Sequence, residues 1–407
     1  MRFVTPIPGA CRSEWWVCSA TWPSCNGSLL SRASRSARAR TLTSAPTEAL
    51  GLVPESDFEA WRLGVRDAVT NDVGDFFATR CARELAGTDV DVTGDVLAGF
   101  LDSGKCVRST FMYIGWLCRA DDDRAALHAA GSLELLHVFA LLQDDVMDGS
   151  PLRRGRPSAH VQFADWHRSR GLSGSPERFG DSAAVLLGDL CLVWAEQMLR
   201  DSGLDHATLG RAWPRYDHMR AELAIGQFAD LVNDAAGLPT LEHVLEVARR
   251  KSGNYTVRRP LELGAAMSDC TPRVLNRLGA YGDAIGEAFQ MRDDLLGVFG
   301  SPEVTGKPAG SDLSERKATS VVVAAHQLAD TTTRAEMSAL MDADELHDGD
   351  VQQWRTLIAA TGAAEWIEQL IDERLTRALD RIDTDQIPDA ARTALVGMAA
   401  ICTDRVA

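Results

Sequence analysis

One segment of the chain reads Glu134-Leu-Leu-His-Val-Phe-Ala-Leu-Leu-Gln-Asp-Asp-Val-Met-Asp-Gly-Ser-Pro-Leu-Arg-Arg-Gly155. In it, an apolar stretch with helical spacing runs into three carboxylates, Asp144, Asp145 and Asp148. On a helix, Asp148 lies about 40° and Asp145 about 100° around the axis from Asp144, so all three side chains point toward one opening. A short acidic run is more often a solvated face or a helix cap, which is how we interpret the Asp-Asp-Asp run at 121–123.

Two features distinguish the first acidic cluster from such a run. Arg153 and Arg154 follow it closely, and their planar groups bind phosphate through paired hydrogen bonds. A second acidic pair, Asp293 and Asp294, ends another apolar helical stretch far along the chain. Close carboxylates repel one another unless a divalent cation neutralises them, and an oxygen-only set of ligands suits Mg²⁺. Two such clusters facing each other would hold several Mg²⁺ ions around one diphosphate leaving group.

Composition limits the class of protein. The chain has 407 residues, a formal net charge of −16 and a pI near 5.0, which argue against a general affinity for nucleic acid or for an anionic membrane. No run of about 18 apolar residues occurs, so no transmembrane segment is expected. Nine cysteines without a Cys-x-x-Cys pair argue against a disulfide framework or a zinc site and indicate a reducing, cytoplasmic location.

The chain divides into an extension and one large domain. Residues 1–50 mix Ser, Arg, Pro and Trp without periodicity, and we expect them to be disordered. A transit peptide and a start codon assigned too far upstream both remain open as explanations for this extension. Residues 51–407 form the domain, in which strand-like alternation is not apparent and apolar residues recur at helical spacing. The predicted helices are 57–86, 91–101, 107–120, 124–148, 158–170, 181–201, 206–235, 240–267, 272–299, 313–329, 350–361, 363–384 and 388–404. This pattern predicts an all-α bundle around a central cavity.

Further polar residues lie between or at the ends of these helices. Lys105 and Arg108 open a predicted helix, where backbone N–H groups and two cations form a natural anion site. His137 lies about 20° from Asp144 on the same helical face, although a histidine among leucines is more often a satisfied core residue. The other candidates are Gln227, Lys251, Gln290, Lys307 and Lys317.

These motifs, in this order, resemble those of the trans-isoprenyl diphosphate synthases, the polyprenyl synthetase family that includes farnesyl and geranylgeranyl diphosphate synthases. The resemblance extends from about residue 55 to the C-terminus. It rests on Gly-Lys-x-x-Arg, on His followed by Asp-Asp-x-x-Asp and Arg-Arg-Gly, and on Gln-x-x-Asp, Lys-Ser, Phe-Gln-x-x-Asp-Asp and Gly-Lys before Asp-Leu and Lys. It implies the isoprenoid synthase fold, a homodimer, and two or three Mg²⁺ ions in each active site.

The resemblance also implies roles for individual residues. The metal-binding residues would be Asp144, Asp145, Asp148, Asp293 and Asp294, and these aspartates would be catalytic together with Lys251. The residues around the allylic diphosphate would be Arg153, Lys251, Lys307 and, in support, Gln290. The pocket for isopentenyl diphosphate would be Lys105, Arg108, His137 and Arg154. Gln227 and Lys317 would also bind substrate.

Three positions depart from the family pattern. Gly297 stands where many relatives have a third Asp in the second acidic motif, so we expect one outer metal ligand to be mediated by water. Cys106 and Ser109 stand where Arg and Pro are common, so we expect a weaker site for isopentenyl diphosphate.

The predicted activity is a Mg²⁺-dependent, head-to-tail condensation of isopentenyl diphosphate with allylic diphosphates. Ala140 lies one turn below Asp144 and leaves room for a growing chain, whereas Phe139 is about 140° from Asp144 and flanks that path. An aromatic residue only at the fifth position before the motif is similar to the geranylgeranyl type, which favours a C20 product. The alternatives are a farnesyl (C15) or longer-chain synthase, a class I terpene cyclase and a non-catalytic partner subunit.

Overall fold

The structure is a computed structural model that describes residues 58–85, 92–101, 104–234, 237–301, 309–343 and 345–404. Contacts divide the chain into Met1–Thr47 and Glu48–Ala407, and every described residue belongs to the second unit. The predicted disordered extension, residues 1–50, lies outside the described residues.

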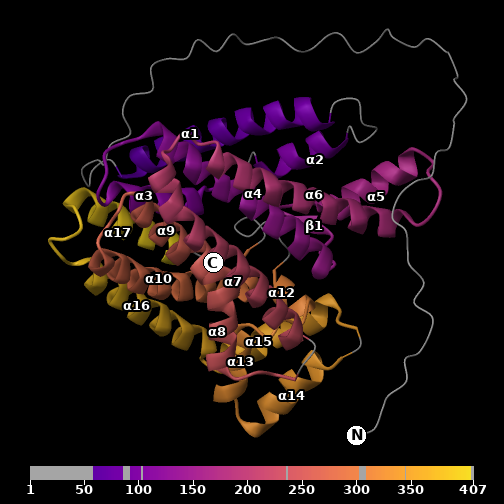
Figure 1. Cartoon of the computed structure of the whole chain (residues 1–407). Coiled ribbons are helices and arrows are strands. Elements are labelled where there is room, and N and C mark those ends of the chain that lie inside the picture. The colour runs from indigo at the N-terminus through magenta and orange to yellow at the C-terminus, as the bar shows by residue number, and fades with distance from the viewer. Residues whose placement is uncertain are drawn as a thin grey trace, which may run out of the picture. The chain divides into compact units, whose positions relative to one another are not determined.

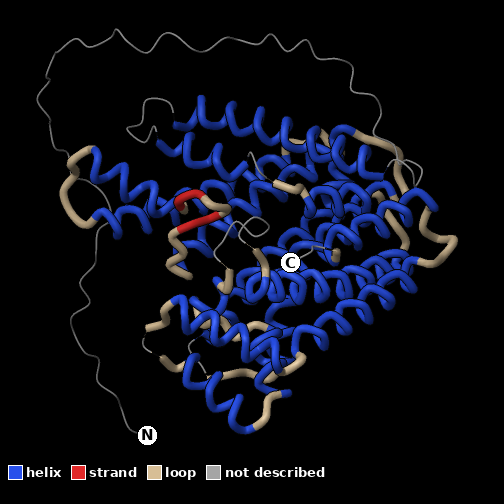
Figure 2. The backbone as a smooth tube through the Cα atoms, turned by 180° about the vertical axis from the view of Figure 1, so that it is seen from behind, coloured by secondary structure: helices blue, strands red, loops and turns tan. Residues whose placement is uncertain are grey.

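Helices make up most of the described part of the chain, which confirms the predicted all-α class (Figures 1 and 2). The first half contains α1 (Phe58–Arg80), η2 (Cys81–Leu85), α2 (Val92–Leu101), α3 (Val107–Leu117), α4 (Arg124–Met147), α5 (Ala159–Ser169), α6 (Pro176–Arg200) and α7 (His206–Asp234). The second half contains α8 (Leu241–Ala248), η3 (Arg249–Arg258), α9 (Arg259–Met267), α10 (Pro272–Phe299), α12 (Ser311–Ser314), α13 (Ser320–Leu328), α14 (Thr331–Met341), α15 (Asp348–Ala360), α16 (Ala363–Ile382) and α17 (Asp389–Thr403). The segments η2 and η3 are π-helical.

Capping residues set where several helices begin. Asp123 accepts hydrogen bonds from the backbone N–H groups of Ala125 and Ala126 at 2.6 and 3.2 Å, so the acidic run at 121–123 caps α4 as interpreted. Helix α6 begins at Pro176, before the predicted start at residue 181. Ser175 caps it, and proline fits the first helical position because its missing N–H has no helical partner there.

The larger differences from the prediction are two divided helices and two missed elements. The helix predicted over 240–267 is divided by the π-helical η3. The helix predicted over 313–329 is two helices, because Arg316 adopts a left-handed φ of 55° and Thr319 caps a new start at α13. Helix α14 was missed, although Asp330 caps it. The hairpin of β1 (Leu152–Arg153) and β2 (Arg156–Pro157) was also missed, since strands of two residues are too short to alternate (Figure 2).

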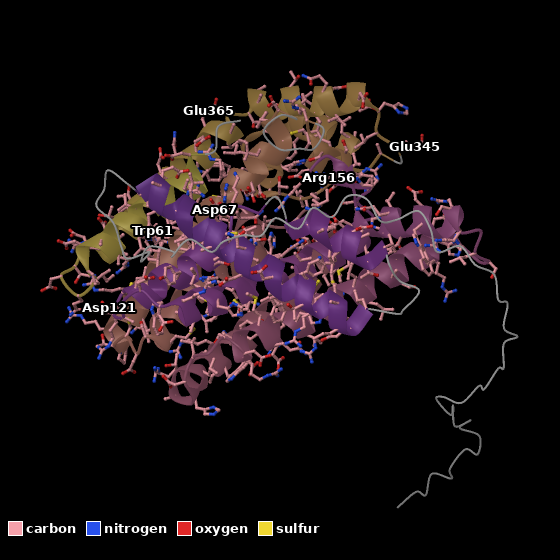
Figure 3. All side chains as sticks on the ribbon, turned by 90° about the horizontal axis from the view of Figure 1, so that it is seen from above. Trp61, Asp67, Asp121, Arg156, Glu345 and Glu365 are labelled. Carbon is pink, nitrogen blue, oxygen red and sulfur yellow. The ribbon has the colours of Figure 1, made fainter. Side chains whose placement is uncertain are left out.

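The helices enclose two hydrophobic cores. The larger core draws buried side chains from α1, α3, α4, α6, α9, the first part of α10, and α17. The start of α1 contacts α17, and Trp61 of α1 lies in this core (Figure 3). The end of α10 joins a second core with α13, α15 and α16. The end of α10 that carries Asp293 and Asp294 therefore packs in the second core.

Two helices bear on the expectation that the chain has no transmembrane segment. Among the described residues, α4 and α6 are long and apolar enough to cross a membrane. Of their most apolar stretches, 61% and 44% are buried inside the protein. Core helices of a bundle have the same composition, so this is weak evidence for a membrane span.

Candidate active site

The first acidic cluster lies where α4 ends. Asp144 and Asp145 occupy its last turn and Asp148 is its C-terminal cap residue. Arg153 of β1 donates from Nε to Asp145 at 2.8 Å, and its Nη2 lies 3.3 Å from Asp144 and also bonds Asp145. Burial raises the pKa of Asp145, which the Arg153 guanidinium opposes. The short hairpin thus places the Arg153 guanidinium next to Asp144 and Asp145, which precede it in the chain.

Two lysines reach the same cluster from distant elements. Lys251 of η3 lies 3.1 Å from Asp144 and 2.5 Å from Asp230 of α7. Lys317, between α12 and α13, lies 2.7 Å from Asp148. Burial disfavours the charged form of Lys251, but Asp144 and Asp230 outweigh it and raise the pKa. The structure therefore surrounds the predicted aspartates with the predicted cations.

The second acidic pair divides into two different environments. Asp294 is buried, and its Oδ2 accepts hydrogen bonds from the backbone N–H and the hydroxyl of Ser320 at 2.9 and 2.6 Å. Its Oδ1 accepts from Gln290 at 2.9 Å. Asp294 thus ties α10 to the start of α13, a role that the sequence did not predict. Asp293, one residue earlier, is only partly buried.

Gly297 leaves space that another carboxylate fills. A Cβ atom added to Gly297 would overlap the carboxylate of Asp312. Gly297 lies one turn after Asp293 on α10, and Asp312 is in the first turn of α12. The second acidic motif therefore lacks its third aspartate, but the carboxylate of Asp312, from another element, lies beside that position.

One cavity of about 620 Å³ is lined by residues of both acidic clusters and by several of the cations. The predicted site residues that line it are Lys105, Asp144, Arg153, Lys251, Gln290, Asp293, Asp294 and Lys317. The polar residues that were not predicted but also line it are Asp230, Asn233, Ser252, Ser311, Asp312 and Thr319. Its apolar wall includes Leu141, Val244, Val247 and Leu296. The cavity can accept a highly anionic group at its polar side and an apolar group at its wall.

Of the residues expected to bind isopentenyl diphosphate, Lys105 lines this cavity, and the others lie outside its described lining. His137 and Arg154 line a smaller neighbouring cavity. Arg108 donates to Thr256 Oγ1 at 2.9 Å, and its guanidinium lies 4.4 Å from the ring centre of Tyr255. Burial, together with the nearby arginines, lowers the pKa of His137 well below 6.5, so its ring is neutral near pH 7. Tyr255 and Thr256 were missed because no local motif links them to Arg108.

The structure does not test the roles predicted for four other residues. Gln227 lies on α7, and its Nε2 is buried without a hydrogen-bond partner in the described part of the chain. Phe139 and Ala140 are partly buried against the larger core, and neither is among the described residues that line the main cavity. Lys307 lies outside the described residues. Their roles stay predictions.

Sequence and structure comparisons agree with these features. The polyprenyl synthetase family profile matches residues 93–358. A geranylgeranyl diphosphate synthase of Mycobacterium tuberculosis is 33% identical over 293 residues, which cover 72% of this chain and 77% of that protein. A (2E,6E)-farnesyl diphosphate synthase of the same species is 31% identical over 307 residues, covering 75% of this chain and 80% of that protein.

A solved structure is also similar over most of the chain. The geranylgeranyl pyrophosphate synthase of Corynebacterium glutamicum, complexed with isoprenyl diphosphate and magnesium, matches with a TM-score of 0.79 and 34% identity. The match covers 87% of this chain and 100% of that chain. These findings confirm the resemblance based on the motifs. The chain belongs to the polyprenyl synthetase family and is a trans-prenyltransferase.

Proposed function

We propose that this protein condenses isopentenyl diphosphate head-to-tail with allylic diphosphates and releases all-trans geranylgeranyl diphosphate (C20). One observation carries the proposal: carboxylates from α4 and α10 and cations from four other segments line a single cavity with an apolar wall. The similarity to synthases of this class supports it.

The carboxylates fit Mg²⁺ as the cofactor. Asp145 Oδ2 is buried and accepts no hydrogen bond from the described residues, so a lone pair is available there. In the described part of the chain, no three His, Cys, Asp or Glu side chains form a ready-made metal cage. Mg²⁺ usually takes one or two carboxylates and completes its shell with water and phosphate oxygens, so such a cage is unnecessary. Asp144, Asp145 and Asp148, with Asp293 and Asp294, would hold two or three ions.

The protein's own cations bind and orient the allylic diphosphate. Bound Mg²⁺ supplies Lewis-acid neutralisation of its charge. Arg153, Lys251 and Lys317 already lie within hydrogen-bond distance of the first acidic cluster, so they can move to phosphate oxygens with little rearrangement. Their fixed charges stabilise the negative charge that develops on the leaving diphosphate as the allylic C–O bond breaks.

The second substrate completes the reaction. Lys105, Arg108 and Arg154 hold isopentenyl diphosphate, and neutral His137 can donate a hydrogen bond to it. The double bond of isopentenyl diphosphate attacks the allylic cation, and a proton then passes to the released diphosphate. Apolar residues such as Leu141 and Leu296 keep water from the cation.

The C20 product rests on the small side chain of Ala140. Similarity does not decide the length, because the geranylgeranyl and farnesyl synthases of M. tuberculosis are 33% and 31% identical to this chain. The variant Ala140→Phe should shorten the product. An unchanged product distribution would refute the role of Ala140.

Exposed apolar side chains support a homodimer. Leu186 and Val193 of α6 and Ile225, Phe228 and Val232 of α7 are each more than half exposed. A second copy of the chain is the partner we propose for this face. Light scattering after size exclusion should give a dimer for the wild type and a monomer for Phe228→Asp, and a dimeric variant would count against the face.

A cytoplasmic location also stays a proposal. It rests on the reduced state expected from the cysteine pattern. The six cysteines within the described residues are free thiols, as a reducing compartment would leave them.

The deciding experiment supplies purified protein with Mg²⁺, isopentenyl diphosphate and, separately, dimethylallyl, geranyl or farnesyl diphosphate. Elongation that ends at C20 is the expected result. A C15 or longer end point would keep the chemistry and refute the length. An allylic diphosphate converted to a hydrocarbon without consumption of isopentenyl diphosphate would indicate a terpene cyclase. No turnover would indicate a non-catalytic subunit.

A further inference from the structure

The start of α3 carries two cations of the isopentenyl diphosphate pocket but lacks a cap of its own. Its N-cap residue, Cys106, has a left-handed φ of 48°, and its side chain makes no capping hydrogen bond to the described residues. The first N–H groups of a helix have no partner within the helix. Lys105 precedes this uncapped turn and Arg108 lies within it, so their positions depend on a partner that orders the turn from elsewhere.

Glu134 of α4 supplies that partner. Its Oε1 accepts the hydroxyl of Ser109 at 2.6 Å and lies 3.4 Å from the backbone nitrogen of Ser109, the third residue of α3. Ser109 is completely buried, and its hydroxyl also lies 2.9 Å from the carbonyl oxygen of Ala130 on α4. A carboxylate at this position also interacts favourably with the helix dipole. The turn is thereby fastened to the helix that carries His137.

The departure from the family pattern at residue 109 makes this contact possible. Proline, which is common there in relatives, has no N–H and no hydroxyl to donate. Ser109 provides both to Glu134. The residue that the sequence marked as a weakness of the pocket is therefore part of its support.

A second contribution of Glu134 concerns Arg154. It lines the smaller cavity together with His137 and Arg154. Burial and Arg153 lower the pKa of Arg154, and the negative charge of Glu134 opposes them. A carboxylate beside a diphosphate pocket would repel the substrate unless it held the surrounding cations in place. With Lys105, Arg108 and Arg154 charged, the pocket keeps a positive charge after Glu134 is counted.

We propose that Glu134 is a positioning residue for isopentenyl diphosphate, which it orients through the Lys105–Arg108 turn and through Arg154. This inference rests on the proposed function, because it assigns that substrate to the pocket. Glu134 does not line the main cavity as described, so the allylic diphosphate should bind independently of it.

The test measures the KM of each substrate at saturating concentrations of the other. Glu134→Ala removes a hydrogen bond to a charged acceptor, so it should raise the KM for isopentenyl diphosphate roughly 10-fold. The KM for the allylic substrate should stay within about twofold, since its ligands are unchanged. Glu134→Gln keeps an acceptor oxygen without the charge, and Ser109→Ala removes only the hydroxyl. Both should raise the same KM by a smaller factor.

Glu365→Ala is the matched control. Glu365 lies in the first turn of α16 and is exposed to solvent, whereas Glu134 lies in the middle of α4 and contacts α3 (Figure 3). It should change neither KM. Circular dichroism checks the folding of each variant, and Glu134→Gln and Ser109→Ala carry the test if Glu134→Ala does not fold.

Two results would overturn the inference while the proposed function stands. In one, active Glu134 variants raise both KM values by the same factor, which would indicate a general structural role. In the other, the KM for isopentenyl diphosphate does not change. Wild-type protein that consumes no isopentenyl diphosphate would refute the proposed function itself, and this inference with it.

Discussion

The position of Lys251 depends on a close approach between α7 and η3, which the substitution Gly226→Ala perturbs. Gly226 is buried, and a Cβ atom added there would lie 2.5 Å from the backbone nitrogen of Lys251 and 2.7 Å from its Cα atom. Ordinary van der Waals contact begins at 3.4 Å, so the two backbones must separate by about 0.9 Å, the difference between these distances. Backbone atoms cannot rotate away as a side-chain end can, so the displacement moves the first turn of η3.

That movement should reach the substrate site. Lys251 Nζ lies 3.1 Å from Asp144 and 2.5 Å from Asp230, and both contacts would lengthen. A misplacement of about 1 Å can lower a rate about 100-fold. Overpacking a well-packed contact costs about 1–3 kcal/mol of unfolding free energy. We expect kcat/KM for the allylic substrate to fall about 10- to 100-fold and the urea midpoint to fall with it.

A second glycine on the same helix provides the control. Gly210 is exposed, and no described atom lies within 4 Å of the position of its Cβ. Gly210→Ala should leave kcat/KM unchanged and stabilise the protein by about 0.5–1 kcal/mol, because alanine favours the helix. Wild-type kcat/KM in Gly226→Ala would refute the idea that this approach positions Lys251. Equal losses in both variants would do the same.

Three further predictions concern other parts of the site. Asp294→Asn should lower the unfolding free energy by about 1–3 kcal/mol in urea titrations, because Asp294 is buried and fully hydrogen-bonded. Asp293→Asn should instead lower turnover at nearly wild-type stability. Equal stability of the two variants would contradict this prediction. Gly297→Ala should cost about 1–3 kcal/mol through overlap with Asp312, and adding Asp312→Ala should restore part of that loss in the same titration. For His137, the folded pKa is depressed below the unfolded value near 6.5, so the substrate-free protein should lose stability as the pH falls below about 6.5, where only the unfolded state binds the proton. His137→Gln should flatten the fall of Tm between about pH 7 and 5, and a parallel profile would argue against a buried neutral histidine.

Much of the fold could be predicted from local patterns. The periodicity around Asp144 placed α4 correctly, and the acidic run at 121–123 was correctly interpreted as its cap. The predicted helix boundaries were wrong where a single residue or turn sets the break. The left-handed Arg316 divides one predicted helix, and the π-helical turn at Lys251 interrupts another. An apolar pattern that continues across such a residue cannot reveal the break.

The residues of the candidate site that belong to sequence motifs could be predicted. Asp144, Asp293, Asp294, Arg153, Lys251 and Lys317 were all expected, and the structure brings them to one cavity. Asp145 and Asp148 do not line it as described, but they contact Arg153 and Lys317, which do. Asp230 stood in a recognised motif, but its contact with Lys251 was not foreseen. The hydrogen bonds of Ser320 to Asp294 were likewise not foreseen, since each joins residues from separate helices.

The sequence by itself determined the helical class, the two acidic motifs and the cations that belong with them, because spacing along one helix fixes which side chains share a face. Only the tertiary structure decided how those faces meet. It showed that Asp294 ties α10 to α13, that Asp312 fills the space beside Gly297, and that Glu134 caps α3 through Ser109. These contacts depend on the packing of helices that lie far apart in the chain, and no local periodicity encodes that packing.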